Sequence, residues 1–128
     1  MSQKTLLLIS SSPHTAKGKK ALQHAQTLLK DGQTLSLFFY GDGAYTASRL
    51  QWQSADVPDV TRAWAVLADT HGLSLPVCVS TALARGITDT DNAKRHDLTG
   101  DNLHPAFSLV GLGDLAMMID DDTTVIQY

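Results

Sequence analysis

The feature that most constrains the fold of this chain is an alternation of short, continuous apolar runs with longer amphipathic stretches. The apolar runs Thr5–Ser10, Leu35–Phe39 and Leu75–Val79 have the length and composition of strands buried on both faces. Between them, residues 21–29 and 60–70 carry apolar side chains at helical spacing, which predicts two helices. This order of elements is typical of an α/β domain.

Two further apolar segments, Phe107–Val110 and Thr123–Gln127, raise the number of predicted strands to about five. Strands that are apolar throughout and alternate with helices predict a three-layer α/β/α sandwich with a mainly parallel sheet. The length of 128 residues suits one core, so residues 1–128 are predicted to form a single domain. Asp114 is expected to cap a short helix that ends near Ile119.

Composition excludes several classes of function. The net charge is −3 and no basic face is evident, so direct binding of nucleic acid is not expected. All 13 acidic residues are Asp, which excludes mechanisms that need Glu, including the zinc-protease helix motif. The apolar run Leu6–Ile9 is too short for a signal peptide core or a membrane span. We therefore expect a cytoplasmic chain with no membrane association.

The sole cysteine, Cys78, is the strongest candidate for chemistry. It falls near the end of the third predicted strand, and Ser80 and Thr81 are expected to cap a helix directly after it. Ligands gather at the carboxyl ends of parallel strands, and backbone N–H groups at a helix start stabilise an anion. These features favour a thiolate nucleophile. The alternative is that Cys78 is a small apolar core residue, and the residues alone leave both interpretations open.

Other motifs do not support a cofactor or a metal. The lysine-rich segment 17–20 departs from a phosphate-binding loop, because Pro13 and Lys20 stand where Gly and Ser or Thr are required. Gly111–Ala116 matches a dinucleotide pattern, but too few residues follow it for a βαβ unit. The five histidines lack ligand spacing. His14 is left open, either as a partner of Cys78 or as an exposed loop residue.

Six segments, in order over nearly the whole chain, resemble the DsrE/TusD family of sulfur-relay proteins. They are Leu37–Tyr45, Arg62–Trp64, Val77–Val79, Ala82–Gly86, Gly111–Leu115 and Val125–Gln127. The resemblance implies a DsrEFH-like three-layer α/β fold and a sulfurtransferase activity. It also implies that the sulfur-carrying cysteine of the family falls on Cys78. The first loop, Ser10–His14, differs from the Gly-containing loop expected at that place.

The resemblance also implies partners and a pathway. Family members of the TusD kind join TusB- and TusC-like subunits in a heterohexamer. They take sulfur from a TusA-like donor and pass it to a TusE-like acceptor, for 2-thiolation of the wobble uridine of certain tRNAs. Related DsrE proteins serve sulfur oxidation, and a non-catalytic scaffold subunit is a further alternative.

The predicted site combines these expectations. Cys78 is the nucleophile and persulfide carrier, and it is expected to be partly exposed. The backbone N–H groups of Ser80 and Thr81 are expected to stabilise its thiolate, and Tyr45 to form a wall of the site. A chain with no second cysteine holds the sulfur until the thiol of a partner arrives. We also predict an oligomer, with apolar surface near Trp52 or Phe107 at an interface.

Overall fold

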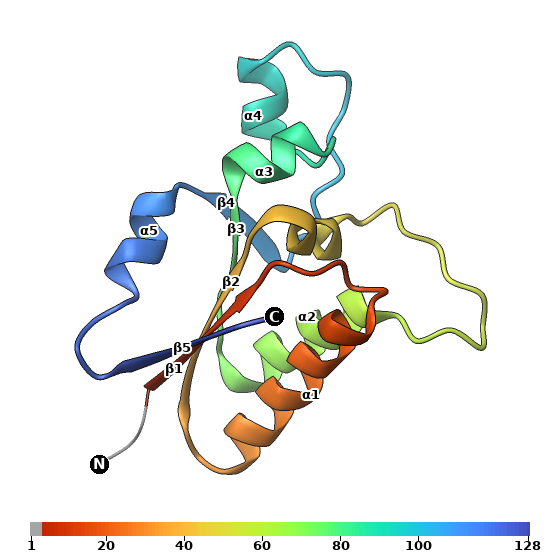
Figure 1. Ribbon diagram of the computed structural model, residues 1–128. Helices are drawn as coiled ribbons and strands as arrows, with labels where there is room; N and C mark the ends of the chain where they lie inside the picture. The colour runs from red at the N-terminus through yellow and green to blue at the C-terminus, as the bar shows by residue number, and fades with distance from the viewer. Residues whose placement is uncertain (1–3) are drawn as a thin grey trace.

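The structure, a computed structural model, describes residues 4–128 and contains a five-stranded sheet flanked by helices (Figure 1). The strand order is β4-β3-β2-β1-β5, and every pairing in it is parallel. The strands are β1 (Lys4–Ile9), β2 (Thr34–Phe39), β3 (Leu75–Cys78), β4 (Phe107–Val110) and β5 (Thr123–Gln127). The predicted α/β fold with a mainly parallel sheet of about five strands is confirmed.

The helices divide unequally between the two faces of this sheet. Helices α1 and α2 cover one face, α5 lies on the other, and α3 and α4 lie beyond the carboxyl ends of the strands (Figure 1). The bounds are α1 (Ala16–Lys30), the 3-10 helix η1 (Gly41–Ala47), α2 (Val60–His71), α3 (Val79–Ala84), α4 (Thr90–Arg95) and α5 (Leu112–Met117). None of the helices in residues 4–128 is long and apolar enough to cross a membrane.

Local capping explains where the two long helices begin and end. The side chain of Thr15 accepts a hydrogen bond from the backbone N–H of Gly18 at 3.1 Å, which starts α1. Asp59 does the same for α2, accepting from the N–H of Arg62 at 3.0 Å. Helix α2 ends at Gly72, whose φ of 65° is left-handed and suits glycine.

The capping predicted for the two short helices was wrong. Helix α3 begins at Val79, so Cys78 is its N-cap and Ser80 and Thr81 lie in its first turn. Helix α5 begins at Leu112, with Gly111 as its N-cap, so Asp114 lies inside the helix and not before it. In both helices the first turn begins before the polar residue that was predicted to cap it. No side chain at either N-cap accepts a hydrogen bond from that turn.

The major core lies between the sheet and helices α1 and α2. Phe39 is at its centre, with ring centroids 5.4 Å from those of both Trp64 and Phe107 in edge-to-face contacts. Phe107 is only 4% exposed, so the predicted contribution of Phe107 to an apolar surface was wrong. The Phe107 side chain lies on the face of β4 that is turned toward the major core, where it contacts Phe39. Trp52, in contrast, is 84% exposed, and an interface at Trp52 stays a prediction.

An interior strand that contains a proline needs an explanation. Pro76 lies in β3, between β2 and β4, and has no N–H group to donate to a neighbouring strand. Strand β3 pairs with β4 from Leu75 to Cys78, whereas its register with β2 joins Phe39 to Val77. Because the pairing with β2 is this short, β3 tolerates Pro76, which could not donate a hydrogen bond in a longer ladder.

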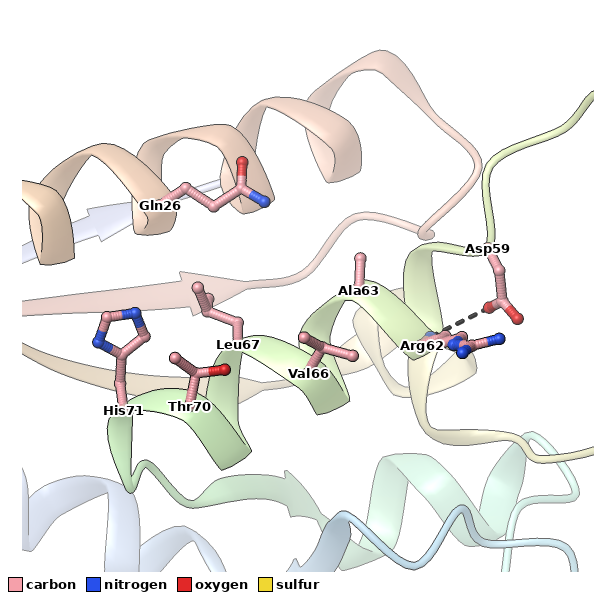
Figure 2. A pocket seen from close by; sticks show the side chains of 8 residues that line it. All are labelled: Gln26, Asp59, Arg62, Ala63, Val66, Leu67, Thr70 and His71. Carbon is pink, nitrogen blue, oxygen red and sulfur yellow. Dashed lines mark hydrogen bonds between the residues drawn. The ribbon is translucent and has the colours of Figure 1, made fainter.

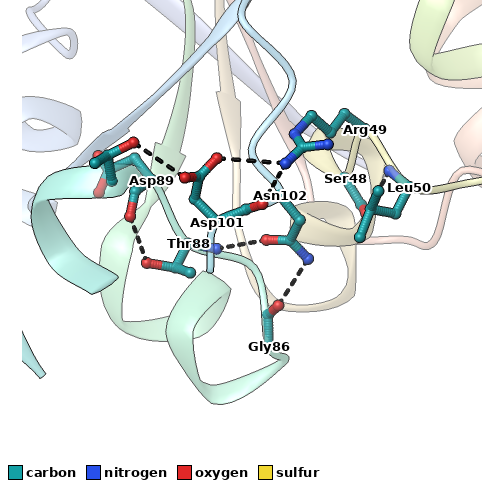
Figure 3. A network of polar contacts seen from close by, with 9 residues as sticks. Ser48, Arg49, Leu50, Gly86, Thr88, Asp89, Asp101 and Asn102 are labelled. Carbon is teal, nitrogen blue, oxygen red and sulfur yellow. Dashed lines mark hydrogen bonds and ion pairs between the residues drawn. The ribbon is translucent and has the colours of Figure 1, made fainter. Parts of the chain in front are cut away.

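A polar network attaches the connection between α4 and β4 to the loops beyond the strands (Figure 3). The Asn102 side chain donates to the carbonyl of Gly86 and accepts from the N–H of Thr88, both at 2.9 Å. Arg49 lies 3.4 Å from a carboxylate oxygen of Asp101. These contacts hold the segments after η1, α3 and α4 together, and so define the shape of the molecule at the carboxyl end of the sheet.

Candidate functional site

The carboxyl ends of the three neighbouring strands β1, β2 and β3 lie at one edge of the sheet. Ile9 is in register with Phe39, and Phe39 with Val77, so the loops that follow these strands start at nearly the same level. In an open parallel sheet, this is the edge at which functional side chains usually gather. The prediction that the three apolar runs end together at one edge is confirmed.

Cys78 occupies the boundary between β3 and α3. It is the last residue of the strand and the N-cap of the helix, with φ −59° and ψ 119°. The boundary arises because residues 75–78 form a fully buried apolar strand, after which the chain turns at once into helical geometry. The predicted position of the cysteine, at a strand end directly before a helix, is therefore confirmed.

The thiol of Cys78 is buried, which the sequence did not predict. The residue is 2% exposed and packs with Leu6 and Phe38 in a second, smaller core. Half-buried apolar side chains complete this thiol cluster, namely Leu8, Val110, Leu115 and Met118. Successive side chains of a strand point to opposite faces, so Cys78 points away from the major core that contains Val77. The expectation that Cys78 is partly exposed was wrong.

The residues of the first turn of α3 follow Cys78 directly in the chain, and among the described residues no hydrogen bond joins them to its thiol. Cys78 makes no side-chain capping hydrogen bond with α3. The Thr81 hydroxyl instead donates to the carbonyl of Cys78 at 3.3 Å, and Ser80 is exposed. Stabilisation of a thiolate by the N–H groups of Ser80 and Thr81 stays a prediction, and it requires the sulfur to turn toward the helix.

Tyr45 and His14 meet in a cavity of about 270 Å³ at the carboxyl edge of the sheet. Arg85 also lines this cavity, and it donates to Asp42 and to the carbonyl of Thr81, both at 3.1 Å. Tyr45 and His14 therefore line the same cavity. Among the described residues, Cys78 is not part of that lining. A role for Tyr45 as a wall of the sulfur site stays a prediction.

A larger cavity, of about 530 Å³, lies between α1 and α2 (Figure 2). Gln26 comes from α1, and apolar side chains of α2 such as Val66 and Leu67 form much of the remaining lining. Leu67 also packs in the major core, so this cavity is on the opposite face of the sheet from the thiol of Cys78. Its size does not make it a site for chemistry on the cysteine.

One exposed ion pair joins the start of β1 to the segment that follows α5. The ammonium of Lys4 lies 3.0 Å from a carboxylate oxygen of Asp120. This hydrogen bond raises the pKa of Lys4 and lowers the pKa of Asp120. The pair is exposed, and it connects the start of β1 to the segment between α5 and β5.

Leu115 and Met118 are the residues of this region that sequence reasoning missed. They come from α5 and the residue after it, and both pack against the cluster that holds Cys78. Their spacing of three residues puts them on one side of a helix, which was the available signal. The sequence did not indicate that this side would face Cys78. Within residues 4–128, no three His, Cys or Asp side chains are grouped as metal ligands would be.

Comparison with known proteins places the chain in a class. Residues 3–128 match the model of the DsrE/DsrF-like family, and the chain belongs to this family. A relative from Pectobacterium carotovorum subsp. carotovorum, named Sulfurtransferase TusD, is 43% identical over 96% of both chains. One of the same name from Salmonella dublin is 46% identical, over 89% of this chain and 90% of its own. The class of activity that these relatives support is sulfur transfer.

A solved structure agrees on the fold. The crystal structure of the ychN protein from E. coli superposes on the whole of this chain with a TM-score of 0.73, at 13% sequence identity. At this identity, the likeness concerns only the arrangement of strands and helices.

Proposed function

We propose that this chain is a sulfur carrier that holds a persulfide on Cys78 and passes it between partner proteins. The observation that carries the proposal is the place of the only cysteine, at the carboxyl end of β3, in a chain with relatives named sulfurtransferases. A sulfur carrier needs a thiol, and the absence of a second cysteine suits the role because a nearby second thiol would convert the persulfide into a disulfide.

The chemistry is an exchange that needs no external oxidant. The thiolate of Cys78 attacks the outer sulfur of a donor persulfide, and a new S–S bond forms as the donor's own S–S bond breaks. The electron pair of the broken bond leaves with the donor thiolate, and the outer sulfur arrives on Cys78. Transfer to an acceptor repeats the exchange in the other direction and returns Cys78 to a thiolate.

The partners and pathway proposed here follow the family resemblance and the name TusD of the relatives. The donor is TusA-like and the acceptor TusE-like, and TusB- and TusC-like subunits complete a heterohexamer. The route ends in 2-thiolation of tRNA in the cytoplasm, with no direct contact between this chain and RNA. The alternative pathway is sulfur oxidation of the DsrE type. The measurement that separates them is 2-thiouridine in bulk tRNA after deletion of the gene.

Burial favours a second candidate, a non-catalytic scaffold subunit. Cys78 is 2% exposed, among Leu6 and Phe38, as a structural cysteine would be. A scaffold needs no accessible thiol and would tolerate replacement of Cys78 by another small residue. The two candidates therefore make opposite predictions for the same variant.

The test is single-turnover transfer from a persulfide-loaded donor to an acceptor protein. Alanine is the replacement to use, because a serine hydroxyl in this apolar cluster would have to be buried at a cost of about 1–3 kcal/mol. Cys78→Ala is expected to abolish transfer while circular dichroism shows a folded chain. Transfer at the wild-type rate by Cys78→Ala would establish the scaffold candidate instead.

A further inference from the structure

Within residues 4–128, α5 is the one helix on its face of the sheet (Figure 1). It has six residues, Leu112–Met117, and none of them is buried. Its N-cap, Gly111, has no side chain to bond the free N–H groups, and Gly113 lies inside the helix, where glycine is unfavourable. A helix this short has little stability of its own. Helix α5 therefore stays in place mainly through its contacts with the sheet.

The contacts of α5 with the sheet involve the thiol cluster that contains Cys78. The thiol cluster contains side chains of neighbouring strands, including Leu6, Phe38 and Val110, which lie in the sheet beside the cysteine. The members from outside the strands are Leu115 and Met118, which belong to α5 and its C-cap. Strand neighbours flank the thiol within the sheet, and among the described residues α5 with its C-cap is the part from outside the strands that packs against this cluster.

The closed arrangement is incompatible with sulfur exchange. The attacking species is a thiolate, and an anion among apolar side chains lacks the solvation it needs. A donor persulfide on another protein must also approach the sulfur of Cys78 in line with the bond that breaks. At 2% exposure, no such approach is open.

We infer that α5 is a gate, in which Leu115 and Met118 close over Cys78 and local displacement of α5 opens the thiol to sulfur exchange. This inference rests on the proposed function of Cys78 as the sulfur carrier. Segments with few buried contacts are the ones that open locally without unfolding of the whole domain. The gate keeps the thiol away from small oxidants between exchanges, because oxidation of a cysteine follows its exposure.

Two adjacent methionines offer a matched pair of variants. Met118 packs against the thiol cluster, whereas Met117 is 87% exposed. The assay is the rate of alkylation by iodoacetamide, which reports a single site because the chain has one cysteine. Met118→Ala is expected to label about tenfold faster than wild type, since it removes one of the two side chains by which α5 and its C-cap pack against the thiol cluster. Met117→Ala is expected to label at the wild-type rate.

The dependence of labelling on urea separates local opening from general unfolding. Local displacement of α5 exposes little surface, so the labelling rate should change little at low urea, whereas labelling through global unfolding follows the full equilibrium slope. The inference is overturned if both methionine variants label alike, or if wild type labels as fast as glutathione. It is also overturned if labelling of wild type follows the global unfolding slope.

Persulfide loading of the same variants distinguishes failure of the gate from failure of the sulfur-carrier proposal. Loading that requires Cys78 but proceeds equally fast in Met118→Ala and Met117→Ala would overturn the gate alone. Faster alkylation of Met118→Ala, with no loading of any variant, would support the gate and refute sulfur carriage by Cys78.

Discussion

Gly43 is the position at which the structure predicts the sharpest loss of stability from a single added methyl group. A Cβ at Gly43 would lie 2.0 Å from the carbonyl oxygen of Ile9 and 2.8 Å from its carbonyl carbon. The oxygen is not free to move, because it accepts a hydrogen bond from the N–H of Tyr40 at 2.9 Å. The added methyl group therefore pushes η1 away from the end of β1.

The expected loss in the free energy of unfolding depends on how little the contacted backbone atoms can move. Overpacking of a core usually costs about 1–3 kcal/mol, and a clash with backbone at the end of a buried strand belongs at the upper end. Gly43→Ala is therefore expected to lower the free energy of unfolding by about 3 kcal/mol, which is a large part of the 5–15 kcal/mol typical of a domain. The thermal midpoint should fall by roughly 10 °C.

The assay is equilibrium unfolding in urea, followed by circular dichroism, with Gly113→Ala as the matched control. A Cβ at Gly113 would meet nothing within 4 Å, and alanine is the better helix former, so this control should be neutral or stabilised by up to about 1 kcal/mol. If the midpoint of Gly43→Ala lies within the error of wild type, the close approach of η1 to β1 is not real and the reasoning fails.

Two further predictions concern polar groups. Thr61→Val should lower the free energy of unfolding by about 1–3 kcal/mol, because the Thr61 hydroxyl donates to the buried carbonyl of Thr46 at 2.7 Å. A urea titration measures this loss. A loss below about 0.5 kcal/mol, which is typical of a surface substitution, would contradict the prediction. The Asp120 carboxylate, whose pKa is lowered by its hydrogen bond with Lys4, should titrate by NMR with a pKa below the ordinary aspartate value of 3.8. The Lys4–Asp120 pair stabilises the fold above pH 3.8, and this contribution is lost as the pH falls through the lowered pKa of Asp120. Lys4→Met should return the pKa of Asp120 toward 3.8. An unchanged pKa of Asp120 in Lys4→Met would refute Lys4 as the cause of the shift.

The centre of the sheet could be predicted from the sequence because the strands β1, β2 and β3 are apolar on both faces. Runs such as residues 35–39 allow few other structures between two amphipathic helices. The boundary at Val79 was missed, because a β-branched residue after an apolar run is typical of a strand, whereas the structure places it in the first turn of α3. Tertiary context overrides this local preference.

The site could be predicted only in part. The position of Cys78 at a strand end follows from the local sequence, whereas the face to which its side chain points does not, because β3 is buried on both faces. The packing of α5 against the thiol cluster could not be predicted either, because Leu115 and Met118 lie in the connection between β4 and β5, more than thirty residues further along the chain. No local pattern in the sequence relates that helix to the third strand.

The central claim is that Cys78 carries sulfur, and the mass of the intact protein tests it most directly. After incubation with a persulfide donor, wild type should gain one sulfur atom, about 32 Da, and reductant should remove it. Cys78→Ala should gain nothing, and peptide mapping of wild type should place the added mass on Cys78. A wild-type chain that stays unmodified by loaded donor, while its thiol is alkylated normally, would contradict the account.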